Sequence, residues 1–249
     1  MRIAVAGGTG TVGREIVSHA RARGHEVVVI ARSAGVDLRT GSGVDAALDG
    51  VDVVVDAASV GTMSAEESTE FFRTASRTLL RAAERAGVPH AVLLSIVGID
   101  RNPHGYYAGK VAQEQVYERA GVPWSIVRAT QFHEFAGQVA PQARFGPVQL
   151  APRARTQPIA AAAVAEHLVS VAEDGPRGRT TDIAGPREEA LPDMIRAWVR
   201  HQGRRGPVIP VSLPGAQMRG MRAGYALPGR EALLLGPTFT EWLVTQPRG

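Results

Sequence analysis

The sequence predicts an α/β protein of the Rossmann type: a doubly wound parallel sheet with a small, irregular C-terminal lobe. Three observations predict this fold. Short apolar runs alternate with amphipathic segments, a glycine-rich turn follows the first run, and Pro and Gly become frequent after about residue 130. We therefore expect a core over residues 1–130 and a lobe over residues 131–249, packed together as a single structural domain.

The expected strands are short and apolar, which is typical of parallel strands buried on both faces. They cover residues 2–6, 25–31, 51–57, 91–95 and 124–128. A long helix is expected from Ser64, because Ser64 and Glu67 have the spacing of a capping box. Further helices are expected over residues 160–173 and 191–202. Asp37 and Leu38 are assigned to the end of a short third strand.

Composition excludes several classes of function. The chain has 249 residues and no cysteine, which excludes disulfides and thiol catalysis. No apolar run approaches the ~18 residues of a membrane-spanning helix, and the first ten residues lack the long apolar stretch that is typical of a signal peptide. The net charge is only +4 and no DNA-reading motif accompanies it. We expect a cytoplasmic, bacterial protein that binds no nucleic acid, no membrane and no metal.

A glycine motif opens the chain. Gly7, Gly10 and Gly13 are spaced by three residues, between the first strand and the first helix. Glycines at such a turn let a pyrophosphate approach the backbone, and the helix N-terminus offers amides and a favourable dipole. The motif therefore predicts a dinucleotide site.

The end of the second strand indicates which dinucleotide binds. Binding of NAD usually requires an acidic residue here, but the chain has Arg32 with Ser33 beside it. A guanidinium favours the 2′-phosphate of NADP. Asp37 follows and is a candidate acceptor for the adenine amino group. The expected cofactor is NADP(H).

The chain has a single lysine among 28 basic residues, and it stands four residues after a tyrosine. Tyr106 and Lys110 share one face of a helix, and Ser95 ends the preceding strand. An ammonium lowers the pKa of a nearby phenol, and lysine does this as a compact point charge. Tyr107, three residues before Lys110, is the alternative partner.

At these residues the chain resembles the short-chain dehydrogenase/reductase superfamily, and more narrowly its atypical, NmrA-like branch of NAD(P)H-binding proteins. The resemblance covers the glycine loop, Asp56-Ala57-Ala58, Ser95, Tyr106–Lys110 and the segment 236–243. It implies a catalytic set of Tyr106, Lys110 and Ser95. Ser95 is followed by Ile96, Val97 and Gly98, where a fuller family pattern has a second polar residue.

The resemblance also implies where cofactor and substrate bind. The expected cofactor contacts are Gly7, Thr9, Gly10, Thr11, Val12, Gly13, Arg32, Ser33, Asp37, Ala57, Ala58 and Lys110. The loop after the strand at 124–128 would line the substrate pocket. The candidates there are Gln131, Phe132, His133 and Tyr107.

The function expected from these features is NADPH-dependent reduction of a carbonyl or conjugated C=C group in a small hydrophobic molecule. Two rivals remain open. One is a non-catalytic NADP-binding regulator or sensor, and the other is a non-redox cyclase or isomerase on the same scaffold. We expect a monomer or a homodimer.

Overall fold

The computed structural model describes residues 1–248 and divides them into two compact units. Unit 1 comprises residues 1–96, 103–128 and 162–181. Unit 2 comprises residues 97–102, 129–161 and the chain from residue 182 onward. The chain enters unit 2 briefly at residues 97–102 and again at residue 129, and residues 162–181 belong to unit 1.

Unit 1 is built on a parallel sheet. Its strands are β1 (Arg2–Ala6), β2 (Glu26–Ile30), β3 (Val53–Asp56), β4 (His90–Ile96), β5 (Trp124–Ala129) and β9 (Gly178–Arg179). The order is β5-β4-β3-β1-β2, and β9 pairs with β5. β1 pairs in parallel with both β2 and β3, so the chain changes direction across the sheet between them. Ligands of doubly wound sheets bind outside the carboxyl ends of the strands at such a point.

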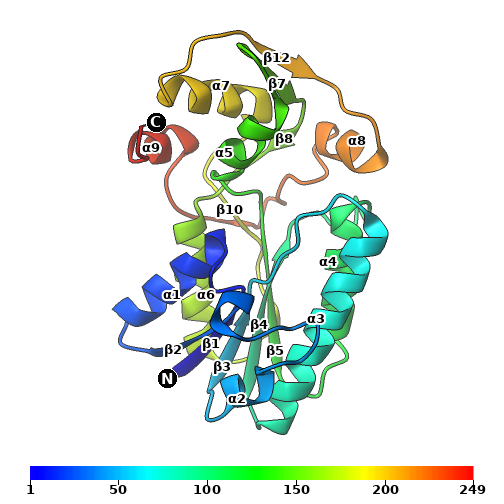
Figure 1. Ribbon diagram of the computed structural model, residues 1–249, viewed down its shortest axis with the longest axis vertical. Coiled ribbons are helices and arrows are strands. Elements are labelled where there is room, and N and C mark those ends of the chain that lie inside the picture. Colours follow the sequence, from blue (N-terminus) through cyan, green and yellow to red (C-terminus); the bar gives the residue numbers. More distant parts are fainter. Residues whose placement is uncertain (249) are drawn as a thin grey trace. The chain divides into compact units, whose positions relative to one another are not determined.

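Helices cover both faces of this sheet. They are α1 (Thr11–Ala22), α2 (Val44–Leu48), α3 (Ala65–Arg85), α4 (Tyr106–Tyr117) and α6 (Ala161–Asp174). Figure 1 shows α1 and α6 on one face, and α3 and α4 side by side on the other. Gly109 permits this close packing of α3 and α4, because a Cβ there would lie 2.6 Å from the Ser68 carbonyl oxygen.

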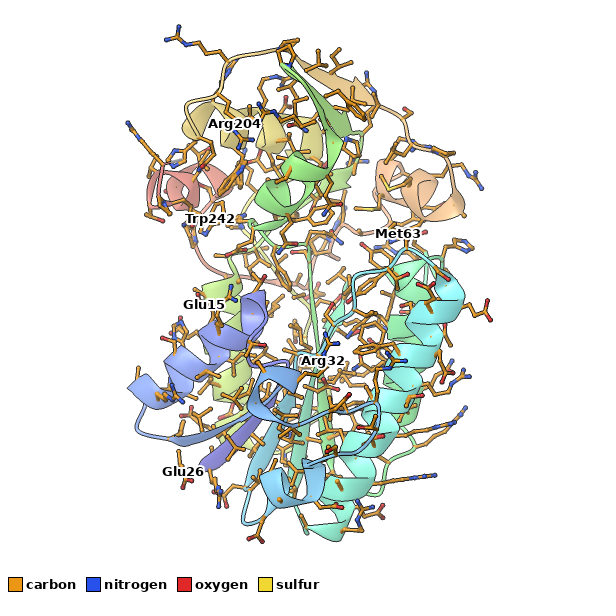
Figure 2. The ribbon with its side chains drawn as sticks, in the orientation of Figure 1. Glu15, Glu26, Arg32, Met63, Arg204 and Trp242 are labelled. Carbon is orange, nitrogen blue, oxygen red and sulfur yellow. The ribbon has the colours of Figure 1, made fainter. Side chains whose placement is uncertain are left out.

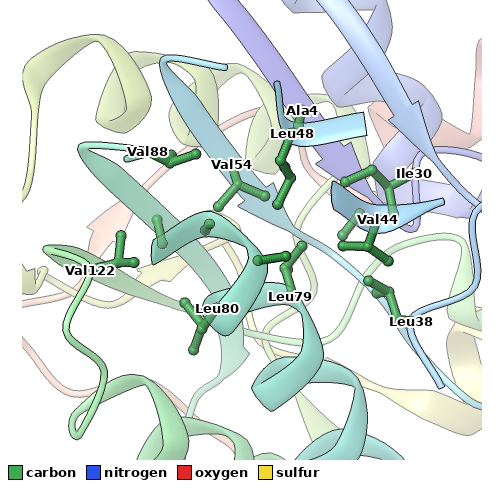
Figure 3. Close-up of a cluster of buried hydrophobic side chains, with 14 of the residues drawn as sticks. Ala4, Ile30, Leu38, Val44, Leu48, Val54, Leu79, Leu80, Val88 and Val122 are labelled. Carbon is green, nitrogen blue, oxygen red and sulfur yellow. The ribbon is translucent and has the colours of Figure 1, made fainter. Parts of the chain in front are cut away.

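A core cluster fills the space between the sheet and helices α2 and α3 (Figure 3). Ile30 and Val54 from the strands meet Leu48 and Leu79 from the helices, and all four are buried. Complete burial of such a side chain contributes about 1.5–3 kcal/mol. The sheet and these helices are therefore held together mainly by apolar packing, which fixes the carboxyl edge of the strands.

The helix starts follow the sequence signals. Ser64 caps α3, and its Oγ accepts a hydrogen bond from the Glu67 amide at 3.3 Å. The Glu67 carboxylate accepts a hydrogen bond from the Thr62 hydroxyl at 2.5 Å, so only the Ser64 side-chain bond of the expected capping box forms. The expected helices at 160–173 and 191–202 form as α6 and α7 (Leu191–His201).

Unit 2 contains short strands, four α-helices and a 3₁₀ helix (Ala140–Ala143) among its described residues. β6 (Arg144–Phe145), β7 (Val148–Pro152) and β12 (Val208–Val211) form a sheet ordered β12-β7-β6. β8 (Arg155–Thr156) pairs with β11 (Glu189–Ala190), and β10 (Ile183–Ala184) pairs with β13 (Leu233–Leu234). The helices are α5 (Phe135–Val139), α7, α8 (Ala216–Arg222) and α9 (Phe239–Val244).

The third strand expected at Asp37 and Leu38 does not form. A 3₁₀ helix, Arg32–Ala34, follows β2 and ends at Gly35, which has a φ of 78°. The next turn is closed by the Asp37 carboxylate, which accepts from the Arg39 amide at 2.8 Å. This local hydrogen bond competes with strand pairing and explains the difference. In residues 1–248, no helix is long and apolar enough to cross a membrane.

Candidate functional site: the carboxyl edge of the unit 1 sheet

The glycine loop packs tightly between the ends of β1 and β3. Gly7 has a φ of 73°, and a Cβ there would lie 2.6 Å from the Ala57 carbonyl oxygen. A Cβ at Gly13 would lie 2.0 Å from the Gly7 carbonyl oxygen. Both positions therefore require glycine. Gly10 is the N-cap of α1 and has no side chain to cap the helix. The N-terminus of α1, with its positive dipole end, therefore has no side-chain cap at Gly10 and favours an anion.

Beside this loop lies a cavity of about 240 Å³. Its walls come from Gly7, the segments 30–32 and 36–39, the loop 59–61, and Phe71. Figure 2 shows Arg32 at the carboxyl end of the sheet. Within residues 1–248, no hydrogen bond or ion pair engages the Arg32 guanidinium, so it is available to an anion. Ser33 is exposed beside it.

The cavity connects to the tyrosine at the start of α4. The Tyr106 phenol and the Ser59 hydroxyl are hydrogen-bonded at 2.8 Å, and Ser59 lines the cavity. The Tyr106 ring packs edge-on against Phe72, with centroids 5.5 Å apart. Burial raises the pKa of Tyr106, and the hydrogen bond with Ser59 partly opposes this. The phenol is therefore protonated at neutral pH.

Lys110 is buried one turn further along α4. Its Nζ donates to the Leu94 carbonyl oxygen at 2.8 Å and to the Gln113 side-chain oxygen. It lies 4.7 Å from the centroid of Phe72. Burial lowers the pKa of Lys110 to about 8, with Asp56 and Glu114 acting in the opposite direction. In residues 1–248 no hydrogen bond joins it to Tyr106, whose phenol is bonded to Ser59.

Asp56 supplies the negative charge that faces Lys110. It ends β3 and accepts from the Ala58 amide, Gln113 Nε2 and the Tyr117 hydroxyl, each at 3.0 Å. Burial raises the pKa of Asp56, while Lys110 and these hydrogen bonds lower it. Gln113 thus bonds both the lysine and the aspartate, and the three side chains form one buried network beneath the loop 57–59.

Ser95 lies elsewhere in unit 1 than its expected role requires. It is only 1% exposed, and its hydroxyl lies beside the Glu114 carboxylate. Burial alone would raise the pKa of Glu114. The pKa is nevertheless lowered, because Glu114 forms an ion pair with Arg128 at 2.6 Å and has the Ser95 hydroxyl beside it. The side chain of Ser95 therefore faces a buried ion pair, and the hydroxyl beside Tyr106 is that of Ser59.

The two adjacent tyrosines differ in access. Tyr106 is half-buried, whereas Tyr107 is only 4% exposed. Burial raises the pKa of Tyr107 above that of an ordinary phenol, and Tyr106 adds to the effect. Of the two phenols, that of Tyr106 is the one bonded to a residue of the cavity wall.

The other expected pocket residues belong to unit 2. His133 is buried, its Nε2 lies 3.0 Å from the Pro237 carbonyl oxygen, and its ring lies 5.4 Å from that of Trp242. Burial lowers the pKa of His133. Gln131 is half-buried and accepts from Thr156 at 3.3 Å, and Phe132 forms a bridge with Ile159. His133 thus packs against Pro237 and Trp242 within unit 2.

Sequence reasoning did not select Ser59 or Gln113. Ser59 is a loop residue 47 positions from Tyr106, so its contact depends on the order of strands in the sheet. Gln113 did carry a local signal, since it stands three residues after Lys110 on the same helix face. Among residues 1–248, no group of three His, Asp or Glu side chains is arranged to hold a metal ion.

Comparison with known proteins identifies the family. A profile described as NAD(P)H-binding matches residues 34–175, which is more than half of the chain. The chain belongs to this NAD(P)H-binding family. The photosystem II assembly factor Ycf39 of Synechocystis is 27% identical over 247 residues, covering 90% of this chain and 74% of that protein.

Solved structures share the fold. The NADPH-dependent quinone oxidoreductase QOR2 of Escherichia coli, in complex with NADPH, gives a TM-score of 0.73 at 19% identity, covering 97% of this chain and 98% of its own. MoeE5, in complex with UDP-glucose and NAD, gives a TM-score of 0.73 at 16% identity, covering 99% of this chain and 97% of its own. A UDP-N-acetylglucosamine 4-epimerase of Bacillus cereus gives 0.69 at 15% identity, covering 98% and 94%. At these identities the likeness shows the Rossmann-like fold, which different reactions use.

The residues present fit the cofactor of this NAD(P)H-binding family. Gly7 lines the cavity with backbone alone, because the Ala57 backbone fills the space that a side chain there would need. The uncapped α1 offers amides to a pyrophosphate. The neighbouring cavity contains the unpaired guanidinium of Arg32. These features lie together at the carboxyl edge of β1, β2 and β3.

Proposed function

We propose that the protein is an NADPH-dependent reductase of a carbonyl or conjugated C=C group in a small hydrophobic molecule, with Tyr106 as the proton donor. The observation that carries the proposal is the 2.8 Å hydrogen bond between Tyr106 and Ser59, because Ser59 also lines the cavity that contains Arg32. A titratable phenol is thereby tied to the wall of the dinucleotide site.

The preference for NADPH rests on Arg32. No acidic residue stands at the end of β2, where carboxylates bind the ribose of NAD. The Arg32 guanidinium would form charge-assisted hydrogen bonds to a 2′-phosphate. The first turn of α1 and the loop of Gly7 and Gly10 would hold the pyrophosphate.

When bound, the reduced nicotinamide supplies a hydride to the substrate carbon. Tyr106 then gives its proton to the carbonyl oxygen, or to the α-carbon of a reduced C=C group, which leaves a phenolate. Ser59 donates a hydrogen bond to that phenolate, and solvent restores its proton. Burial keeps the Tyr106 phenol protonated at neutral pH, which suits an acid. Lys110 would stabilise the phenolate once its ammonium leaves Leu94 and Gln113.

The experiment that tests this function is NADPH oxidation by the purified chain against a panel of quinones, enals and hydrophobic ketones. Quinones are included because the similar E. coli structure is a quinone oxidoreductase. We expect turnover with at least one member, and tighter binding of NADP⁺ than of NAD⁺. Binding without turnover across the panel would contradict the reductase.

A non-catalytic NADP-binding sensor is the second candidate, and one observation favours it. Lys110 is bonded to Leu94 and Gln113, and Ser95 lies beside Glu114, so in residues 1–248 no hydrogen bond joins either of these expected catalytic side chains to Tyr106. For this candidate we expect cofactor binding that is unaffected by Tyr106→Phe and no reduction of any compound in the panel.

A further inference from the structure

The outer face of α3 carries a row of arginines that the cofactor site does not use. Arginine occurs at every fourth position, and all four side chains are exposed: Arg73, Arg77, Arg81 and Arg85. We call these four residues the arginine row. At about 1.5 Å of rise per residue, neighbours in the row are about 6 Å apart and the row is about 18 Å long. Figure 2 shows side chains extending outward from this helix, drawn in cyan.

The charge of the arginine row is largely uncompensated. Arg85 pairs with Asp45 at 2.5 Å, whereas no acid pairs with the other three anywhere in residues 1–248. Of the acids on α3, Glu67 accepts from Thr62 and Glu70 accepts from Thr74 at 3.0 Å. Exposed Glu84 stands between Arg81 and Arg85 in the sequence and forms no ion pair with either of them in residues 1–248. Like charges four residues apart destabilise a helix, so an anionic ligand would relieve this repulsion.

The arginine row borders a shallow hollow of about 340 Å³. It is lined by Thr74, Arg77, Thr78, Arg81 and Arg85. Guanidinium forks and hydroxyls are donors that bind carboxylates or phosphates, and guanidinium does so in a bidentate manner. The hollow shares no lining residue with the cavity of Arg32. The hollow is therefore separate from the cavity of Arg32, and its donors are of the kind that bind anions.

We propose that the arginine row docks an acidic helix of a partner protein, whose carboxylates recur every four residues. Such a helix presents its acids about 6 Å apart, the spacing of the row itself. Nucleic acid fits the surface less well. No aromatic side chain lines the hollow, although single strands bind by base stacking, and the net charge of +4 gives only weak long-range attraction.

The test uses the full chain and two labelled peptides of alanine, glutamine and glutamate with identical composition. One peptide has glutamate at every fourth position, and the other has its glutamates contiguous. Fluorescence anisotropy should show salt-dependent binding of the spaced peptide and weaker binding of the contiguous one. Arg77→Glu with Arg81→Glu should weaken binding of the spaced peptide at least tenfold. Arg77→Ala with Arg81→Ala should weaken it less.

The matched control is Arg21→Glu with Arg119→Glu, which makes the same change in net charge at exposed positions of unit 1 outside the row. It should leave peptide affinity within twofold, and all variants should keep NADPH binding. Equal weakening by the control pair, or no binding by the native chain, would overturn the proposal. So would row-dependent binding of a thymidine oligonucleotide in preference to the peptide, or a row-dependent dimer in sedimentation.

Discussion

The Tyr106 phenol and the Ser59 hydroxyl are hydrogen-bonded at 2.8 Å, although the two residues are 47 positions apart. The contact joins the first residue of α4 to the loop that follows β3. Ser59 also lines the cavity that contains Arg32, so one short loop contacts both the proposed proton donor and the proposed cofactor site.

Removing the Ser59 hydroxyl should alter the acidity of Tyr106. The hydrogen bond lowers the pKa of the phenol, so Ser59→Ala should raise it. A neutral hydrogen bond contributes about 0.5–1.5 kcal/mol, so kcat should fall about two- to tenfold. The alkaline limb of the pH–rate profile should move upward. Ser59→Thr keeps a hydroxyl and should restore both quantities. An unchanged profile in Ser59→Ala would show that the contact is not used.

Reversing the charge at Arg32 should change cofactor preference. Arg32→Glu loses a charge-assisted contact to the 2′-phosphate, which should weaken NADP(H) binding by about 1.5–3 kcal/mol, or tenfold and more. Binding of NAD(H) should improve relative to NADP(H). Fluorescence titration of both cofactors measures this, with Arg21→Glu as the matched charge control. Equal losses for the two cofactors would rule out the 2′-phosphate role.

A side chain at Gly10 should block the dinucleotide without unfolding the chain. Gly10 has a φ of −76°, which any residue adopts, and a Cβ there would approach only the Gly7 carbonyl oxygen, at 3.2 Å. Gly10→Val should therefore fold but abolish the rise in melting temperature that NADP⁺ causes. The native chain and Gly229→Ala are the references, because Gly229 lies outside the site, has no positive φ and has no atom within 4 Å of an added Cβ. A retained rise would assign the loop another role.

Cofactor affinity should depend on pH through Lys110. Burial lowers the pKa of this lysine to about 8, so its ammonium is present below pH 8 and is lost above it. Because the dinucleotide is anionic, NADPH affinity should fall as pH rises through about 8. Lys110→Gln should bind NADPH more weakly and without this pH dependence. The same pH dependence in Lys110→Gln would exclude Lys110 as its source.

Lys110→Arg keeps its charge at high pH, but its larger planar head does not fit the buried site. Cofactor affinity and turnover should therefore both fall in this variant.

Local patterns predicted much of the fold. Three features could be predicted because each depends on neighbouring residues or on a regular spacing of apolar residues. They are the parallel strands, the glycine loop and the helix that begins near Ser64. The prediction of a third strand ending at Asp37 and Leu38 was wrong, because the Asp37 carboxylate accepts a hydrogen bond from the Arg39 amide and closes a turn there. The family match and the parallel sheet confirm the Rossmann-like assignment.

The candidate site was less accessible to sequence reasoning. The four-residue spacing of Tyr106 and Lys110 placed both on α4, but it could not specify the partner of either side chain. Lys110 meets Gln113 and the Leu94 carbonyl because α4 packs against β4, and Ser95 points toward Glu114 on the same helix. Such contacts depend on the packing of distant segments, which no local pattern encodes.

The most direct test of the proposed reductase compares turnover of Tyr106→Phe and Tyr107→Phe on a verified substrate. Loss of a general acid typically costs about 10²–10⁴-fold, so Tyr106→Phe should lower kcat by that amount and leave NADPH affinity nearly unchanged. Tyr107 is buried and should tolerate the same change with nearly native kcat. If Tyr106→Phe keeps full turnover, Tyr106 is not the proton donor and the proposed mechanism is wrong.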